Sequence, residues 1–292
     1  MAGRRARTQR AARAESGAPP ALSAEEVSAF RERVLGHYRE HGRHDLPWRL
    51  TRDPYAVLVS EVMLQQTQVA RVVPFFERWM DAFPTPDALA AAPLDAVLEH
   101  WQGLGYNRRA VALKRAGEAI VCDHGGEVPR DYDALLALPG VGPATASAVL
   151  AFAYGEARPY IETNIRSVYL HEFFADAAEV PDSVILPLVE VTLDRDDPRT
   201  WYYALMDWGV HLKRTVPNPS CRSRHHTRQS AFEGSHRQLR ARIVRAVMAT
   251  PGTTAPELAE ETGADVAAVE RALEELVVEG FFAEEGERYR IA

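Results

Sequence analysis

Apolar residues recur every three or four positions along most of this chain, the spacing that places them on one face of an α-helix. Ser23 and Glu26 have the spacing of a capping box, which predicts a first helix from there through Tyr38. The same periodicity predicts further helices over residues 55–67, 69–83, 86–91, 93–101, 107–124, 132–138 and 144–153. Because no alternating strand of any length precedes residue 212, we predict a mainly α body.

The C-terminal part of the chain has a different order of elements. Helical periodicity covers three stretches there, residues 237–249, 255–261 and 266–279. Turn signals at Pro251-Gly252 and Gly263 separate them, and two short apolar runs, Phe281-Phe282 and residues 289–291, predict a hairpin. Three helices followed by a hairpin are typical of a winged helix-turn-helix. We therefore expect a disordered basic tail (1–22), a helical body (23–212), a basic loop (213–235) and a winged helix-turn-helix (236–292).

Composition limits the class of protein. With 292 residues, 46% hydrophobic and 26% charged, the chain is typical of a folded protein with one large or two ordinary domains. It has no run of about 18 apolar residues, which argues against a membrane span, and its Arg-rich start lacks the apolar core of a secretory signal. With only Cys122 and Cys221, a disulfide framework is not expected, and a reducing cytoplasm fits best.

The net charge of −7 argues weakly against a nucleic-acid partner, but the charge is unevenly distributed. Residues 255–292 hold eleven acids and three arginines, a net charge of −8, so the rest of the chain sums to +1. Basic clusters lie within that remainder. Net charge therefore does not decide between DNA and other partners.

The stretch LPGVGPATASAVL, residues 138–150, places two glycines and two prolines at the start of an apolar helix. A tight Gly-x-Gly turn between two helices exposes successive backbone N–H groups, which suits a phosphate. The alternative is a simple helix–helix turn with packing glycines. The short helix predicted just before the turn favours a helix-hairpin-helix, which grips the DNA backbone without reading sequence.

Four motifs extend this interpretation: LPWR (46–49), SEVMLQQTQV (60–69), GLGYNRRA (103–110) and LPGVG (138–142). In order and spacing they resemble those of the MutY adenine glycosylases, members of the endonuclease III superfamily of base-excision enzymes. The resemblance covers roughly residues 23–212, about two-thirds of the chain. It implies a mainly α helix-hairpin-helix glycosylase fold with two helical subdomains, to which a small winged helix-turn-helix is added.

The resemblance also implies two catalytic carboxylates, because base removal passes through an oxocarbenium-like state. Glu61 matches the family's acid, which protonates the adenine ring and activates water. Its apolar neighbours suggest a poorly hydrated cleft that would raise its pKa; the alternative is an ordinary surface acid. Glu162, in YIETNIRSV, occupies the place of the family's aspartate. Glutamate keeps the charge but adds a methylene, and plain helix capping by Glu162 is the alternative role.

Ala144 determines the expected reaction type. Bifunctional relatives carry a lysine at this position, two residues after the hairpin, and its amine attacks the sugar. Alanine has no amine, so we expect a monofunctional glycosylase that leaves an abasic site and has no lyase activity.

Reaching a base inside a duplex requires extruding it and filling the gap. Gln66 and Tyr106 match the family's gap-filling and intercalating residues, although a buried core tyrosine is the alternative for Tyr106. Arg49 matches a base-pocket residue. Asn107 stands where adenine glycosylases often have a second tyrosine, which loosens the assignment to adenine.

Many family members bind a [4Fe–4S] cluster through four cysteines, but only Cys221 lies in the corresponding region, and Lys213 stands near the first cysteine's place. We therefore expect no cluster; zinc at Cys221, His225 and His226 lacks an evident fourth ligand. The resemblance leaves room for a monovalent cation at the helix-hairpin-helix.

The residues expected to meet DNA phosphates are Gly140, Val141, Gly142, Lys213, Arg214, Arg222, Arg224 and Arg228.

The C-terminal segment differs from the family's usual MutT-like domain, which senses 8-oxoguanine. Its helix over residues 266–279 offers Arg271 among four glutamates, so contact with protein or self-association is at least as plausible as DNA reading. The leading interpretation is a monofunctional glycosylase that removes adenine from a mispair in double-stranded DNA, in the cytoplasm at the nucleoid. The alternatives are removal of thymine or uracil opposite guanine, and a non-catalytic DNA-binding regulator.

Overall fold

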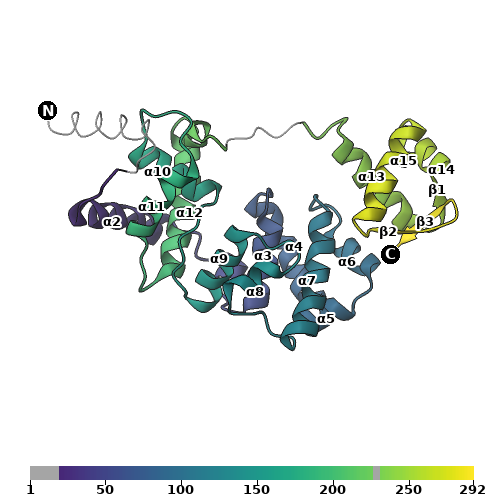
Figure 1. Cartoon of the computed structure of the whole chain (residues 1–292), viewed down its shortest axis with the longest axis horizontal. Coiled ribbons are helices and arrows are strands. Elements are labelled where there is room, and N and C mark those ends of the chain that lie inside the picture. The colour runs from purple at the N-terminus through teal and green to yellow at the C-terminus, as the bar shows by residue number, and fades with distance from the viewer. Residues whose placement is uncertain (1–19, 226–230) are drawn as a thin grey trace. The chain divides into compact units, whose positions relative to one another are not determined.

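The computed structural model describes residues 20–225 and 231–292, and it is mainly helical (Figure 1). Nearly all of the expected basic tail, and Arg228 of the expected basic loop, lie outside the described residues. The chain forms two compact units: the first comprises residues 1–57 and 142–228, the second residues 58–141 and 229–292. Each unit is therefore built from two stretches that are far apart in the sequence.

The first unit is a group of helices around an aromatic core. Its helices are α2 (Ala24–His41), α9 (Pro143–Val149), α10 (Thr163–Phe173), α11 (Asp182–Thr192) and α12 (Pro198–Thr215), with short helical turns at Pro47–Arg49, Leu150–Tyr154 and Pro219–Arg222. The capping box of Ser23 and Glu26 is present at the start of α2. Phe30 of α2 packs edge-on against Tyr169 and Phe173 of α10 and Trp201 of α12, with ring centroids 5.1–5.7 Å apart. These contacts join α2 to helices that follow it by 139–171 residues.

The second unit begins within α3 and continues through five further helices to the glycine-rich turn that ends at residue 142. The helices are α3 (Pro54–Leu64), α4 (Val69–Ala82), α5 (Pro86–Ala91), α6 (Leu94–Trp101), α7 (Arg108–His124) and α8 (Tyr132–Ala137). Trp79 and Trp101, both fully buried, meet edge to face with centroids 5.5 Å apart. The predicted helix over residues 55–67 was three residues too long, because Gln66 adopts a left-handed conformation (φ 57°) that no α-helix continues through.

The C-terminal part of the second unit packs three helices against a small sheet. Its elements are α13 (His236–Ala249), β1 (Thr253–Thr254), α14 (Ala255–Thr262), α15 (Val266–Val278), β2 (Phe282–Glu285) and β3 (Arg288–Ile291). The antiparallel sheet has the order β1-β3-β2, with Phe282 opposite Ile291 and Thr253 opposite Tyr289. Its helices and hairpin follow the predicted order, whereas the two-residue β1 is too short for sequence periodicity to reveal. None of the helices in the described residues has the length and apolar character that a membrane crossing demands.

Candidate functional site

The glycine-rich turn lies where the chain passes from the second unit to the first. The Val141 N–H donates to the Leu138 carbonyl (3.1 Å), and the Val141 side chain is buried. Gly140 adopts φ 77°, and a Cβ there would lie only 2.8 Å from the Cβ of Ala112. Both facts require glycine at residue 140, so the turn is built for close backbone approach.

Gly142 is the N-cap of α9 and Ala144 lies in its first turn. No side-chain oxygen caps this helix, so its first N–H groups point away from the helix without a side-chain acceptor. Ala144 is half-buried and offers only a methyl group. Gly140 is exposed and Gly142 half-buried, so contact of this turn with a phosphate stays a prediction, and residue 144 offers no amine beside it.

Glu61 occupies a distinctive position on α3. Every residue from Tyr55 to Met63 is buried except Glu61, which is half-buried. A helix surrounded by protein thus presents one carboxylate at its surface. The buried neighbours on either side distinguish Glu61 from an acid on a fully solvated helix face, and its role as the catalytic acid stays a prediction.

Glu162 is the N-cap of α10 in the first unit. Its Oε1 accepts hydrogen bonds from the backbone N–H groups of Asn164 and Ile165, each at 2.7 Å, and its Oε2 accepts one from the Asn164 amide (3.2 Å). The helix-capping role that the sequence left open is therefore present. It fixes both carboxylate oxygens and places them at the N-terminus of a helix.

Lys213 was expected to contact DNA phosphates, but its amine is engaged beside Glu162. Its Nζ donates to the Asn164 Oδ1 (2.8 Å), and the side chain is half-buried. Burial lowers the pKa of Lys213, the charge of Glu162 raises it, and the charge of Arg166 lowers it further. Lys213 therefore belongs to the network around Glu162.

The other predicted cations of this region differ in exposure. Arg214, in the last turn of α12, and Arg224 are exposed. Arg222 is half-buried, and its Nη1 is buried without a hydrogen-bond partner. Arg214 and Arg224 are thus the two whose charge faces solvent in the described residues of this group.

Arg49, expected in the base pocket, makes a buried ion pair within the first unit. Its two Nη atoms donate to Asp207 at 2.8 and 2.9 Å, and the two side chains are 4% and 3% exposed. Its guanidinium also lies 4.3 Å from the ring centre of Tyr203. Burial would raise the pKa of Asp207, but the hydrogen bonds and charge of Arg49, together with hydrogen bonds from Arg43, hold it below its ordinary value. This guanidinium is committed to the interior, and its expected contact with a base stays a prediction.

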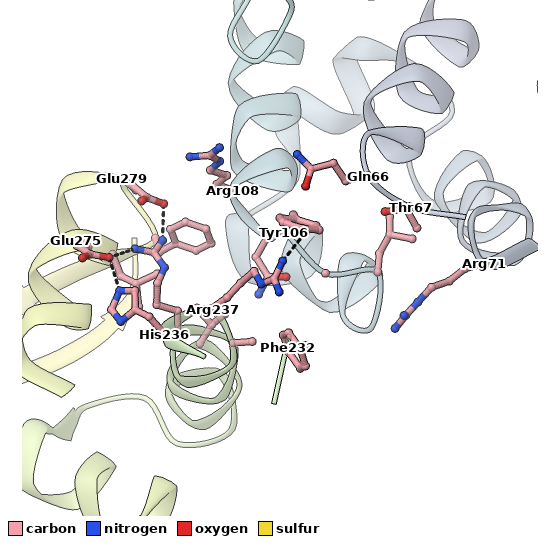
Figure 2. Close-up of a pocket in the computed structure, with 18 of the residues that line it drawn as sticks. Gln66, Thr67, Arg71, Tyr106, Arg108, Phe232, His236, Arg237, Glu275 and Glu279 are labelled. Atoms are coloured by element: carbon pink, nitrogen blue, oxygen red, sulfur yellow. Dashed lines mark hydrogen bonds and ion pairs between the residues drawn. The ribbon is translucent and has the colours of Figure 1, made fainter. Parts of the chain in front are cut away.

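Gln66 and Tyr106 lie in two neighbouring turns of the second unit. Both adopt left-handed backbone conformations, φ 57° and φ 50°, which residues other than glycine rarely adopt. Gln66 is exposed and Tyr106 half-buried, so Tyr106 is not the core tyrosine that was the alternative. Both line one cavity of about 770 Å³, as does Asn107, which precedes α7 (Figure 2).

The opposite wall of this cavity comes from the C-terminal segment, as Figure 2 shows. Arg237 of α13 donates to the Tyr106 hydroxyl (2.6 Å), and its guanidinium lies over the rings of Tyr106 and Phe232 at 5.4 and 5.6 Å. Glu275 of α15 pairs with His236 and Arg240, and the hydrogen bond from His236 lowers the pKa of Glu275. Sequence reasoning missed Arg237, because its contact with Tyr106 spans 131 residues and belongs to no motif.

No cluster of three or more histidine, cysteine or acidic side chains in the described ranges, residues 20–225 and 231–292, is arranged to hold a metal ion. The chain's two cysteines cannot supply the four thiolates of a [4Fe–4S] cluster. The residues present do not fit that group.

Comparisons with known proteins agree with this geometry. The model of the HhH-GPD superfamily of base excision DNA repair proteins matches residues 59–193. The adenine DNA glycosylase of Mycolicibacterium smegmatis is 36% identical over 260 residues, which are 82% of this chain and 88% of the relative. The one of Mycobacterium tuberculosis is 36% identical over 285 residues, 88% of this chain and 93% of the relative. The human adenine DNA glycosylase is 43% identical over 210 residues, 67% of this chain and 38% of the relative.

Two solved structures share the fold. A thermostable thymine-DNA glycosylase superposes with a TM-score of 0.58 at 25% identity, covering 67% of this chain and 92% of that chain. An endonuclease III in a non-covalent DNA complex gives 0.57 at 22% identity, covering 69% and 93%. The predicted mainly α glycosylase fold is confirmed. The chain belongs to the HhH-GPD superfamily of base excision DNA repair proteins and, within it, to the family of adenine DNA glycosylases.

Proposed function

We propose that this protein is a monofunctional DNA glycosylase that hydrolyses the N-glycosidic bond of adenine in a mispair and leaves an abasic site. The observation that carries the proposal is Glu61, the one residue with solvent access in an otherwise buried stretch from Tyr55 to Met63. The mycobacterial adenine DNA glycosylases, similar over most of both chains, support adenine as the base.

The two carboxylates have distinct roles in this proposal. Glu61 donates a proton to the leaving base, and the resulting carboxylate directs a water molecule to the sugar. Glu162, held in place by the backbone N–H groups at the start of α10, stabilises the positive charge that develops on the sugar. Glu162 has one methylene more than aspartate, and in this proposal its hydrogen bonds to the start of α10 hold the longer side chain in one position.

Double-stranded DNA is the proposed partner. The exposed amides at the Gly140–Gly142 turn and the side chains of Arg214 and Arg224 would meet phosphates, and Gln66 and Tyr106 would fill the gap left by the extruded base. Arg228 keeps this role as a prediction from sequence. The acidic α15 is proposed to contact protein, since phosphates would repel it.

The decisive experiment is a panel of duplexes carrying adenine, thymine, uracil or hypoxanthine opposite each normal base and opposite 8-oxoguanine. We expect strand breaks at adenine only, and only after alkali, because Ala144 supplies no amine for strand scission. Cleavage at thymine opposite guanine would instead favour the activity named for the thymine-DNA glycosylase that shares this fold. Breaks without alkali would contradict the monofunctional mechanism. Binding without any cleavage, unchanged in Glu61→Gln, would favour the non-catalytic regulator.

A further inference from the structure

Arg109, in the first turn of α7, is a buried arginine whose hydrogen bonds converge on two loops. The residue is 7% exposed. Its guanidinium donates five hydrogen bonds of 2.6–3.1 Å, from Nη1 to the carbonyls of Val62, Met63 and Gln65 and from Nη2 to the Thr67 hydroxyl and the Gly105 carbonyl. None of these acceptors is an acid.

The positions of the acceptors are informative. Val62 and Met63 belong to the last turn of α3, where a helix leaves its carbonyls without intrahelical partners. The Gln65 and Gly105 carbonyls belong to the peptide groups that immediately precede Gln66 and Tyr106. Holding those peptide planes restrains the φ angles of Gln66 and Tyr106, which are both left-handed. One guanidinium thus ties together two turns that lie about 40 residues apart in the sequence.

This arrangement is costly for folding alone. Burial lowers the pKa of Arg109 to about 10, and the Tyr106 charge only partly opposes that effect. The Nε atom is buried without a hydrogen-bond partner. Even a buried ion pair often stabilises a protein no more than apolar residues of similar volume would. A buried arginine without an acidic partner, whose acceptors lie at the end of α3 and in the two turns that hold Gln66 and Tyr106, therefore points to a requirement of that region.

We propose that Arg109 is a positioning residue that presets Gln66 and Tyr106 in the conformation needed to replace an extruded base. The inference rests on the proposed glycosylase function and deepens it. Arg109 acts through the two turns and is not itself a contact to DNA. By holding both left-handed residues before DNA arrives, it removes the cost of ordering them when the base leaves the helix.

Arginine is specifically suited to this role. Its planar fork reaches acceptors in several fixed directions, whereas a lysine ammonium is a compact charge with three donors. Arg109→Met keeps most of the length and loses every hydrogen bond. Arg109→Lys keeps the charge and some of the bonds, so it is the conservative variant that should partly rescue function.

The test compares single-turnover rates on two substrates. One substrate carries the cleavable mispair found in the panel. The other places the same base opposite an abasic-site analogue, so that the base is unpaired before it is extruded. We expect Arg109→Met to slow the first by about 100-fold and the second by less than about fivefold, with Arg109→Lys in between. Hydrogen exchange in the free protein should rise at the amides of residues 65–67 and 104–106.

Arg31→Met is the matched control. Arg31 donates to the carbonyls of Thr192 and Leu193 at the end of α11, so its loss also uncaps a helix but leaves the two turns intact. We expect it to change both rates equally and to leave exchange at the turns unaltered. Equal slowing of both substrates in Arg109→Met, or unchanged exchange at the turns, would overturn the inference. A wild-type protein inert on every duplex would overturn the proposed function instead, and the exchange data would still decide whether Arg109 sets the turns.

Discussion

The segment that carries Glu61 is held in place by burial, whereas the segment that carries Glu162 is held by hydrogen bonds. Around Glu61, the residues of α3 are packed on all sides and leave one carboxylate at the surface. Around Glu162, the backbone N–H groups of Asn164 and Ile165 donate to the carboxylate, and Lys213 donates to the side chain of Asn164. Packing positions the first group and polar contacts position the second.

The difference matches the chemistry proposed for each. A general acid must hold a proton near neutral pH, which burial among apolar neighbours favours. A carboxylate that stabilises a cation must stay ionised, which requires donors and a helix N-terminus. Because the two environments are built differently, substitutions should affect activity and stability in different proportions at the two positions.

The largest effect on activity is expected at Glu61. Glu61→Gln keeps the shape but cannot deliver the proton, so the single-turnover rate should fall by about 10⁴-fold. DNA binding and the denaturant midpoint should stay near wild type, because the carboxylate lies at the edge of the packed region. The control is Glu77→Gln, an exposed glutamate on α4. A Glu61→Gln variant with full activity would remove Glu61 from the mechanism.

Glu162→Gln should affect both properties. The rate should fall by about 10²–10³-fold through loss of the charge facing the sugar, and the free energy of unfolding by about 0.5–1 kcal/mol through a weakened cap. Urea unfolding and single-turnover kinetics measure the two effects. Asp131→Asn, at the N-cap of α8, where Asp131 accepts from the Ala134 N–H (2.9 Å), is the matched control for the capping part alone. Loss of stability with full activity would leave Glu162 as a cap only.

The helices were predictable because periodicity and capping residues are local signals. Ser23, Thr254 and Gly263 mark helix ends in the sequence and do so in the structure. The prediction of one helix over residues 144–153 missed that α9 ends at Val149 and continues as a π-helical turn to Tyr154. That change depends on how the carbonyls of the last turn are used, which no periodicity records.

The site was predictable only where a motif carried it. Glu61, Gln66 and Tyr106 were assigned by their match to family motifs, but the residues that support them were not. Arg109 lies within a quoted motif, yet its acceptors are 42–47 residues away on the α3 side, so its role appears only in the fold. The motif that contains Arg49 likewise gave no indication that its guanidinium pairs with Asp207, 158 residues later.

A smaller effect is expected when the charge at residue 162 is kept and only its reach is changed. Glu162→Asp should cap α10 well, so stability should be unchanged. The carboxylate would move by about one bond length, and we expect the single-turnover rate to fall about tenfold. Kinetics on the preferred duplex, beside Glu162→Gln, separate length from charge. A rate equal to or above wild type would show that the pocket is not fitted to the longer side chain.

The smallest effect concerns Lys213, which supports Glu162 from α12. Burial lowers the pKa of Lys213, so above that lowered pKa and up to about pH 10.5 the unfolded chain binds more protons at this site than the folded chain does. Stability contributed by this group therefore rises with pH across that window, and the charged amine is unfavourable below it. Lys213→Met should remove the rise, measured as the difference in urea midpoints between variant and wild type from pH 7 to 10.5. Arg214→Met, next to it and exposed, should leave the slope intact. An unchanged slope in Lys213→Met would mean that the folded and unfolded chains bind a proton equally well at Lys213. The Glu162 carboxylate would then be fixed by the backbone N–H groups of α10 alone.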